Sequence, residues 1–153
     1  MNVVVIGHGM VGHKLLECLV DDASAALHIT VLCEEPRPAY DRVHLSEFFS
    51  GKSAEDLSLV KPGFFDRENV LLRLNAKAVS IDREAHTVSI STGETLSYDK
   101  LVLATGSSPF VPPMTGSDRE DCLFIAPLKI SSDAGMRRAG EVGCGGRRRP
   151  VGA

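Results

Sequence analysis

The sequence predicts an α/β fold in which a parallel sheet, built on a βαβ unit, carries a small antiparallel insertion. Three observations lead to this prediction. Residues 2–33 contain an apolar strand, a glycine-rich turn, a helix with an apolar stripe and a second apolar strand. Short strand patterns separated by turn residues fill positions 70–97. A further apolar run at 100–104 then indicates a return to the parallel sheet.

The composition is that of one ordinary globular domain. The chain has 153 residues, of which 43% are hydrophobic and 24% are charged. Its net charge of −3 argues against nucleic-acid binding, which favours a basic surface. Because there is neither an 18-residue apolar run nor a signal peptide, we expect a cytoplasmic protein that does not bind membranes.

The four cysteines do not form a ligand set. Cys18, Cys33, Cys122 and Cys144 include no C-x-x-C pair, so we expect no metal site, either zinc or iron–sulfur, in this chain. Cys18 falls in the apolar helical stripe and Cys33 in an apolar strand. We therefore expect both side chains to be small buried hydrophobes.

The first βαβ unit is the clearest part of the pattern. Residues 2–6 form a β-branched run that ends at a glycine and predict a fully buried strand. A helix should follow over 10–20, and the second strand should span 28–33. The apolar stripe of this helix comprises Val11, Leu15, Leu16, Leu19 and Val20.

The middle of the chain should contain irregular segments and short elements. Residues 34–49 are polar, and Pro36 and Pro38 lie near their start, so we expect no regular helix there. A capped helical turn is expected over 53–57 and a short helix over 62–68. The expected later strands span 70–74, 78–81, 87–91, 95–97 and 100–104.

The turn after the first strand carries the G-x-G-x-x-G pattern, at residues 7–12. This context, strand before and helix after, is typical of a Rossmann-like dinucleotide site. Gly7 would permit the tight turn, Gly9 would let a pyrophosphate approach the backbone, and Gly12 would allow close packing of the helix. A glycine-rich turn without a ligand is the alternative.

Two further segments fit a nucleotide site. Glu34 follows Gly12 by 22 residues and closes the second strand, where a carboxylate can accept hydrogen bonds from both ribose hydroxyls. Glu35 should point the other way, and two solvated carboxylates at a strand end are the alternative. Ala104-Thr105-Gly106 ends the last strand and would bring a small, permissive backbone against a cofactor.

His8 and His13 invite a catalytic interpretation, because histidine titrates near neutral pH. Neither has a partner carboxylate at a suitable spacing. We therefore expect them to belong to the loop and first helical turn at the phosphate site, and the sequence leaves the catalytic residues unknown.

Taken in order, these motifs resemble the FAD domain of the pyridine-nucleotide-disulfide-oxidoreductase-like flavoproteins. Segments 7–13, 33–46 and 98–107 are similar, within that superfamily, to the large subunits of NAD(P)H-dependent nitrite reductases. The resemblance implies that Gly7, Gly9, Met10 and Gly12 hold the FAD pyrophosphate and that Glu34 holds the adenosine ribose. It also implies Arg42 near the cofactor, Ala78 and Val79 near the adenine, and Ala104, Thr105 and Gly106 near the phosphates and ribitol.

The chain departs from the pattern of its dithiol relatives. Those proteins carry a Cys-x4-Cys helix after the loop, whereas this chain has Leu45-Ser46-Glu47-Phe48-Phe49, which excludes disulfide reduction. Related ferredoxin reductases have Leu-Ser-Lys there. Glu47 replaces that lysine, so no residue that tunes the flavin ring can be named.

The resemblance further implies a partial FAD domain at 1–125, since the family's final strand follows an NAD(P)H domain. Residues 126–153 are rich in glycine and arginine without apolar periodicity, and we expect a disordered or out-of-frame tail there. An out-of-frame tail is possible, because codons can be chosen for residues 141–153 that also encode the family's second glycine motif. The motif is obtained when these codons are read one nucleotide later.

The implied parent reaction passes electrons from NAD(P)H through FAD towards nitrite. Sirohaem and an iron–sulfur cluster belong only to the full-length parent, which could be an oligomer or pair with a small subunit. This chain alone should be inactive. The alternatives are a fragment of a rubredoxin- or ferredoxin-reductase-like flavoprotein, or a non-catalytic nucleotide-binding fragment.

Overall fold

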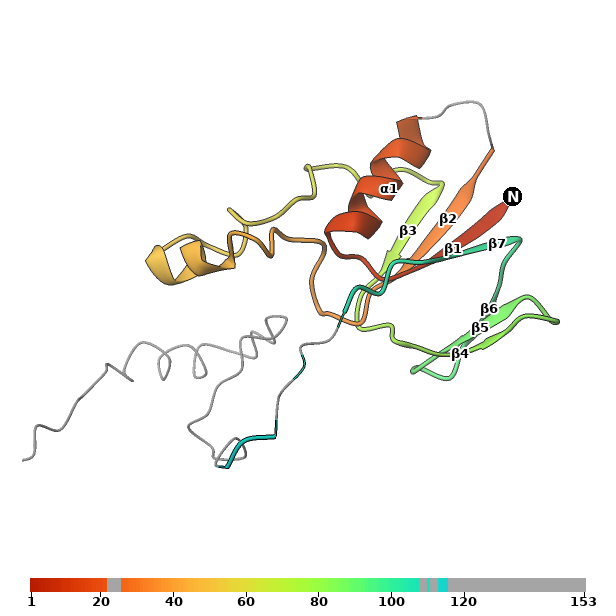
Figure 1. Cartoon of the computed structure of the whole chain (residues 1–153). Helices are drawn as coiled ribbons and strands as arrows, with labels where there is room; N and C mark the ends of the chain where they lie inside the picture. Colours follow the sequence, from red (N-terminus) through yellow and green to blue (C-terminus); the bar gives the residue numbers. More distant parts are fainter. Residues whose placement is uncertain (22–25, 108–109, 111–112, 116–153) are drawn as a thin grey trace, which may run out of the picture. The chain divides into compact units, whose positions relative to one another are not determined.

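The computed structural model of the chain describes residues 1–21, 26–107, 110 and 113–115 (Figure 1). Residues 1–107 form one compact unit. The elements described below all belong to this unit. The predicted tail at 126–153, Cys122 and Cys144 lie outside the described residues, so the predictions for them stay predictions.

A parallel four-stranded sheet forms the centre of this unit, with the strand order β3-β2-β1-β7. All three strand pairs are parallel, and helix α1 connects β1 to β2. This arrangement confirms the predicted α/β fold. The elements are β1 (Asn2–Ile6), α1 (Met10–Asp21), β2 (His28–Leu32), β3 (Val70–Arg73) and β7 (Lys100–Leu103).

A three-stranded antiparallel sheet forms the connection from β3 to β7, as predicted. Its strands are β4 (Ala78–Asp82), β5 (Thr87–Ile90) and β6 (Thr95–Ser97), in that spatial order. Gly93, with a φ of 88°, lies in the turn between β5 and β6. The chain then returns to the parallel sheet, where the Asp99 carboxylate accepts a hydrogen bond from the Asn2 backbone N–H at 2.6 Å.

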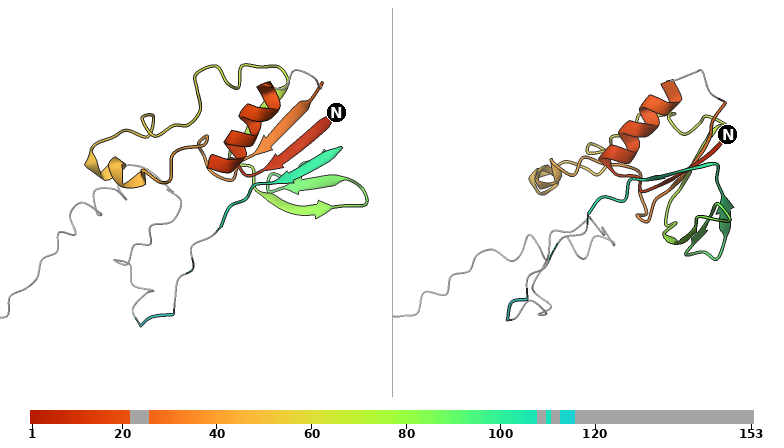
Figure 2. Two further views of the ribbon diagram at one scale, coloured as in Figure 1. Left: turned by 45° about the horizontal axis from the view of Figure 1, so that its top comes forward. Right: turned by 45° about the vertical axis from the view of Figure 1, so that its right-hand side comes forward.

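The β1 strand is buried on both faces, because each face packs against a different layer. Val3 and Val5 pack with α1 in one core cluster, whereas Val4 and Ile6 pack with the antiparallel sheet in another. Helix α1 and the β4–β6 sheet accordingly lie on opposite faces of the parallel sheet (Figures 1 and 2). Continuous apolar runs are typical of strands covered in this way.

The buried face of α1 matches the predicted stripe except at its start, where Val11 faces outward. Val11 is 77% exposed and Cys18, seven residues later on the same face, is also exposed. The side of α1 that faces the core carries Gly12, His13 and the predicted Leu16, and Leu19 and Val20 of the stripe pack against the same core cluster. The expectation that Cys18 is buried was therefore wrong, whereas Cys33 is buried as predicted.

The long segment between β2 and β3 also differs from the prediction. The 3-10 helix η1 (Leu45–Ser50) forms near the end of the stretch expected to be irregular, and its segment extends away from the sheet (Figure 1). Ser53 and Asp56 make the expected reciprocal capping bonds, Ser53 N to Asp56 Oδ2 at 2.9 Å and Asp56 N to Ser53 Oγ at 3.1 Å. The segment closes as a turn rather than a helix.

The helix predicted over 62–68 is absent, and turns and a bend replace it. Gly63 has a φ of 76°, in the left-handed region, which is incompatible with an α-helix. No helix within the described ranges is long and apolar enough to cross a membrane.

Candidate cofactor-binding site

Three parallel strands end in register and bring distant segments to one edge of the sheet. Ile6 at the end of β1 pairs with Leu32 of β2 and with Leu103 of β7. The next residues continue this register: Gly7 N donates to Leu32 O and Ala104 N donates to Ile6 O, both at 2.8 Å. The glycine turn and the Ala104–Gly106 segment are therefore neighbours at the carboxyl edge.

This edge is a topological switch point. The chain moves from β1 to β2 and β3 on one side, whereas β7 lies on the other side of β1. Loops that follow strands on the two sides of such a point diverge and leave a crevice. Open α/β sheets bind their ligands there.

The three glycines of the turn differ in their surroundings. A Cβ on Gly7, whose φ is 103°, would lie 2.3 Å from the carbonyl oxygen of Ala104. A Cβ on Gly12 would lie 2.4 Å from the carbonyl oxygen of Gly7. Nothing lies within 4 Å of the Cβ position of Gly9. Gly7 and Gly12 thus allow close packing, while Gly9 leaves its backbone open to a ligand.

The first turn of α1 suits an anion. Its N–H groups lack intrahelical acceptors, and the helix dipole places a partial positive charge there. This turn, which starts at the exposed Met10, contains no acidic side chain that would compete with an anion. A pyrophosphate beside Gly9 would meet these groups.

Glu34 is exposed at the same edge and is paired. Its side chain is 64% exposed, and its Oε1 accepts a hydrogen bond from Lys77 Nζ at 2.9 Å. Lys77 directly precedes Ala78, which is half-buried, and Val79, which is 59% exposed. The structure therefore brings the predicted ribose ligand beside the segment predicted to contact the adenine. No pattern in the sequence indicated Lys77, which lies 43 residues from Glu34.

Arg42 lies over the Tyr40 ring, with its Cζ 5.3 Å from the ring centroid, and forms an ion pair with Glu35. The two neighbouring carboxylates thus have different partners, as expected for adjacent residues in an extended chain. Thr105 and Gly106 are exposed and follow Ala104, and Gly106 has a φ of 69°.

His8 and His13 are buried in the turn and in the first turn of α1, at 5% and 3% exposure. Burial lowers the pKa of His8 to about 4 and also lowers the pKa of His13, so both rings are neutral at pH 7. His8 Nδ1 accepts a hydrogen bond from Ala39 N at 3.0 Å. No local pattern indicated this contact, because 31 residues separate the partners.

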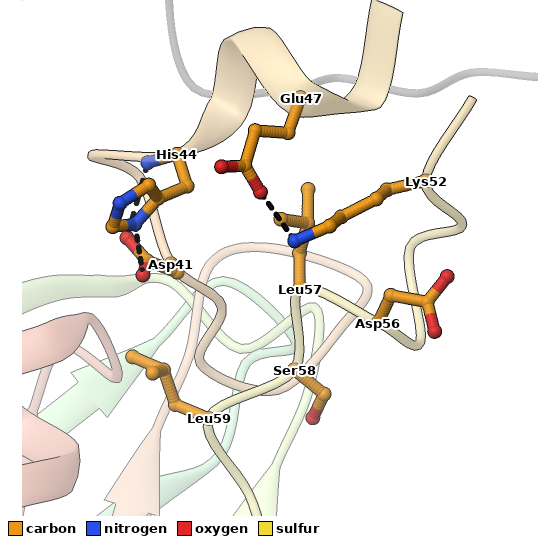
Figure 3. A pocket seen from close by; sticks show the side chains of 8 residues that line it. All are labelled: Asp41, His44, Glu47, Lys52, Asp56, Leu57, Ser58 and Leu59. Carbon is orange, nitrogen blue, oxygen red and sulfur yellow. Dashed lines mark hydrogen bonds and ion pairs between the residues drawn. The ribbon is translucent and has the colours of Figure 1, made fainter. Parts of the chain in front are cut away.

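A pocket of about 220 Å³ lies between η1 and the 52–59 segment, and four of its lining side chains form two pairs, His44 with Asp41 and Lys52 with Glu47 (Figure 3). His44 Nδ1 lies 2.7 Å from Asp41 Oδ2, and this contact raises the pKa of His44 and lowers that of Asp41. Glu47 and Lys52 point toward each other and form an ion pair (Figure 3). The described residues contain no group of three potential metal ligands.

Comparison with known sequences identifies the family. Residues 1–137 match the family described as pyridine nucleotide-disulphide oxidoreductase. The chain belongs to this family. The predicted resemblance is thereby confirmed, and membership supports the binding of FAD or NAD(P)H in general.

Relatives in the family include two bacterial nitrite reductase subunits. The chain is 44% identical to the nitrite reductase (NADH) large subunit of Escherichia coli K12, over 95% of the chain and 18% of that protein. It is 49% identical to the nitrite reductase [NAD(P)H] large subunit of Klebsiella oxytoca, over 94% of the chain and 16% of that protein. The chain therefore spans less than a fifth of the length of either relative.

Solved structures of reductases share the fold of this chain. A ferredoxin reductase from Rhodopseudomonas palustris matches with a TM-score of 0.69 and 25% identity, over 80% of this chain and 30% of that one. The NADH:rubredoxin oxidoreductase of Clostridium acetobutylicum matches with a TM-score of 0.63 and 25% identity, over 74% and 29%.

Proposed function

We propose that residues 1–125 form part of an FAD-binding domain, with the cofactor at the carboxyl edge of β1, β2 and β7. Gly7, Gly9, Met10 and Gly12 would surround the pyrophosphate, and Glu34 would accept hydrogen bonds from the adenosine ribose. Ala78 and Val79 would lie near the adenine and Arg42 near the cofactor. Ala104, Thr105 and Gly106 would lie toward the phosphates and ribitol.

The observation that carries this proposal is the open backbone of Gly9 at the same edge of the sheet as Glu34. The turn around Gly9 is tightly packed at Gly7 and Gly12, yet empty where a pyrophosphate would approach. The adjacent helix terminus carries no competing carboxylate. On the next strand, Glu34 lies two residues past Leu32, which pairs with Ile6 at the end of β1.

We further propose that the parent protein transfers electrons from NAD(P)H through FAD towards nitrite. Its support is the 44–49% identity to the two nitrite reductase large subunits. FAD supplies the acceptor for a hydride from the nicotinamide. The residues of this chain would bind and orient FAD, while sirohaem and an iron–sulfur cluster would belong to the full-length parent.

Titration with adenine nucleotides tests the binding proposal. The purified chain should bind FAD and ADP, and an adenosine with a 2′-phosphate should bind more weakly because Glu34 repels it. Glu34→Ala should weaken FAD binding by about 1–3 kcal/mol, the cost of leaving polar groups unpaired. Tighter binding of the 2′-phosphorylated nucleotide would reverse the assignment of Glu34.

The second candidate is a ferredoxin- or rubredoxin-reductase-like flavoprotein. The structural similarity to those two reductases favours it. It shares the FAD site proposed above and differs in the electron acceptor. The coding sequence downstream of the codon for Ile125 separates the two, since only a nitrite reductase would encode ligands for sirohaem and a cluster.

A further inference from the structure

His8 has no role in the proposed contacts with FAD, although it lies between two glycines of the cofactor turn. The side chain is 5% exposed, and its ring makes T-shaped contacts with His13 and Phe65, at centroid distances of 5.4 Å in both cases. Burial of such a polar group is unfavourable unless its hydrogen bonds are made. The hydrogen bonds of His8 therefore indicate what the residue does.

The hydrogen bond to Ala39 defines the state of the ring. A neutral imidazole donates from one nitrogen and accepts at the other. Because Nδ1 accepts from the backbone N–H of Ala39 at 3.0 Å, the proton resides on Nε2. Within the described part of the chain, Nε2 has no acceptor.

The same hydrogen bond joins two segments of the candidate site. Ala39 is 1% exposed and lies in the 34–42 segment, which carries Glu34 and Arg42. Its carbonyl oxygen accepts from Leu59 N at 3.0 Å, so both backbone groups of Ala39 are paired. Without an acceptor at position 8, the Ala39 N–H would be buried and unsatisfied.

We propose that His8 is a positioning residue, which holds the 34–42 segment against the glycine turn through Ala39. The contact sets where Glu34 and Arg42 lie relative to the backbone around Gly9. The inference rests on the proposed function, because FAD is the ligand that these groups would surround. The hydrogen bond itself can be tested without a ligand.

Packing alone is the competing explanation, since the rings of His8, His13, Phe64 and Phe65 are in mutual contact. Two substitutions separate the explanations. His8→Asn supplies a side-chain oxygen that can replace Nδ1 as acceptor but leaves part of the volume empty. His8→Leu fills the volume and supplies no acceptor.

The experiment compares the full chain with these two variants and with His28→Leu. His28 is an exposed histidine at the start of β2, away from the carboxyl edge, and serves as the matched control. Amide hydrogen exchange at Ala39 is measured without FAD, and FAD affinity is measured by titration. We expect protection of Ala39 in the wild-type chain, in His8→Asn and in the control. In His8→Leu, exchange at Ala39 should be at least roughly tenfold faster and FAD binding roughly tenfold weaker.

The proposal is overturned if His8→Leu keeps the protection of Ala39 and the FAD affinity of the wild-type chain, or if His8→Asn behaves no better than His8→Leu. If the wild-type chain binds no FAD, the proposed function fails. In that case the hydrogen-exchange measurement alone decides whether His8 holds the 34–42 segment against the glycine turn.

A measurement on the wild-type chain covers the case in which His8→Leu does not fold. The nitrogen NMR spectrum of the His8 ring should show a protonated Nε2 and an unprotonated Nδ1 at neutral pH. A protonated Nδ1 would show that the ring does not accept from Ala39.

Discussion

Gly7 and Gly9 have different tasks, although both belong to one motif. Gly7 has a positive φ, and its missing Cβ makes room for the carbonyl of Ala104, so it joins the turn to the end of β7. Gly9 touches nothing at its Cβ position. The first glycine should therefore matter for folding, and the second for the ligand.

Alanine substitutions test this division. Gly7→Ala should lower the free energy of unfolding by about 2 kcal/mol or more, because the new Cβ meets backbone atoms and φ is unfavourable. Gly9→Ala should change stability by less than about 0.5 kcal/mol yet weaken FAD binding roughly tenfold or more. Urea unfolding and FAD titration measure the two effects. Equal loss of stability in both variants would contradict the assignment.

The buried His8 ring makes stability depend on pH. Its pKa is lowered by burial from 6.5 to about 4. Between these values the unfolded chain binds a proton that the folded chain does not. The contribution of His8 to the free energy of unfolding should therefore decrease as pH falls from about 6.5 to 4, by up to about 3 kcal/mol. At pH 7 the His8 ring is neutral in both the folded and the unfolded chain, and it adds no pH dependence to the free energy of unfolding.

Urea unfolding of the wild-type chain and of His8→Asn at pH 7 and pH 5 measures this contribution. Stability should fall more with acid in the wild-type chain, because asparagine does not titrate. Carboxylates with lowered pKa, such as Asp41, lose stabilisation as pH falls through their folded pKa, but they do so in both proteins. An identical decrease in the two proteins would show that folding does not lower the pKa of His8.

At the scale of the elements, apolar runs and turn residues predicted the strands of both sheets and the position of α1. These signals are local, and tertiary packing reinforced them. Prediction failed near two glycines. The left-handed φ of Gly63 is incompatible with the predicted helix, and at the start of α1 the small Gly12 faces inward while Val11 is exposed. The periodicity of hydrophobic residues predicts neither the backbone angle of Gly63 nor the orientation of Val11.

The candidate site shows the same limit. The strand order and register that place Gly9 and Glu34 at one edge follow from the βαβ pattern. The partners Lys77 and Ala39 do not, because they come from segments 43 and 31 residues away from Glu34 and His8. Contacts of this kind depend on the conformations of irregular loops. Composition and residue spacing do not specify these conformations.

The ion pair of Glu34 with Lys77, just before β4, should tune nucleotide selectivity. Lys77 offsets the charge with which Glu34 repels a 2′-phosphate. Lys77→Met should therefore increase the preference for ADP over its 2′-phosphorylated form, by roughly threefold for so exposed a pair. Stability should hardly change. Lys100→Met, at the opposite end of β7, is the control, and an unchanged affinity ratio in Lys77→Met would remove Lys77 from the site.

At the scale of the whole molecule, the proposed FAD contacts come from four separate parts of the chain. The glycine turn, the 34–42 segment, the 78–79 pair and the 104–106 segment are joined through the parallel sheet and its antiparallel insertion. A ligand that binds all of them in the folded state only must stabilise the whole unit of residues 1–107.

Thermal unfolding measures this coupling. At an FAD concentration 100-fold above its dissociation constant, binding should add about 2.7 kcal/mol to the free energy of unfolding. For a unit of this size, the midpoint should rise by on the order of 10 °C. Gly9→Ala should show a smaller shift at the same concentration, because its fold is intact but its affinity is reduced. A midpoint unaffected by saturating FAD in the wild-type chain would mean that FAD does not bind the folded sheet edge, whatever the stability of the chain alone.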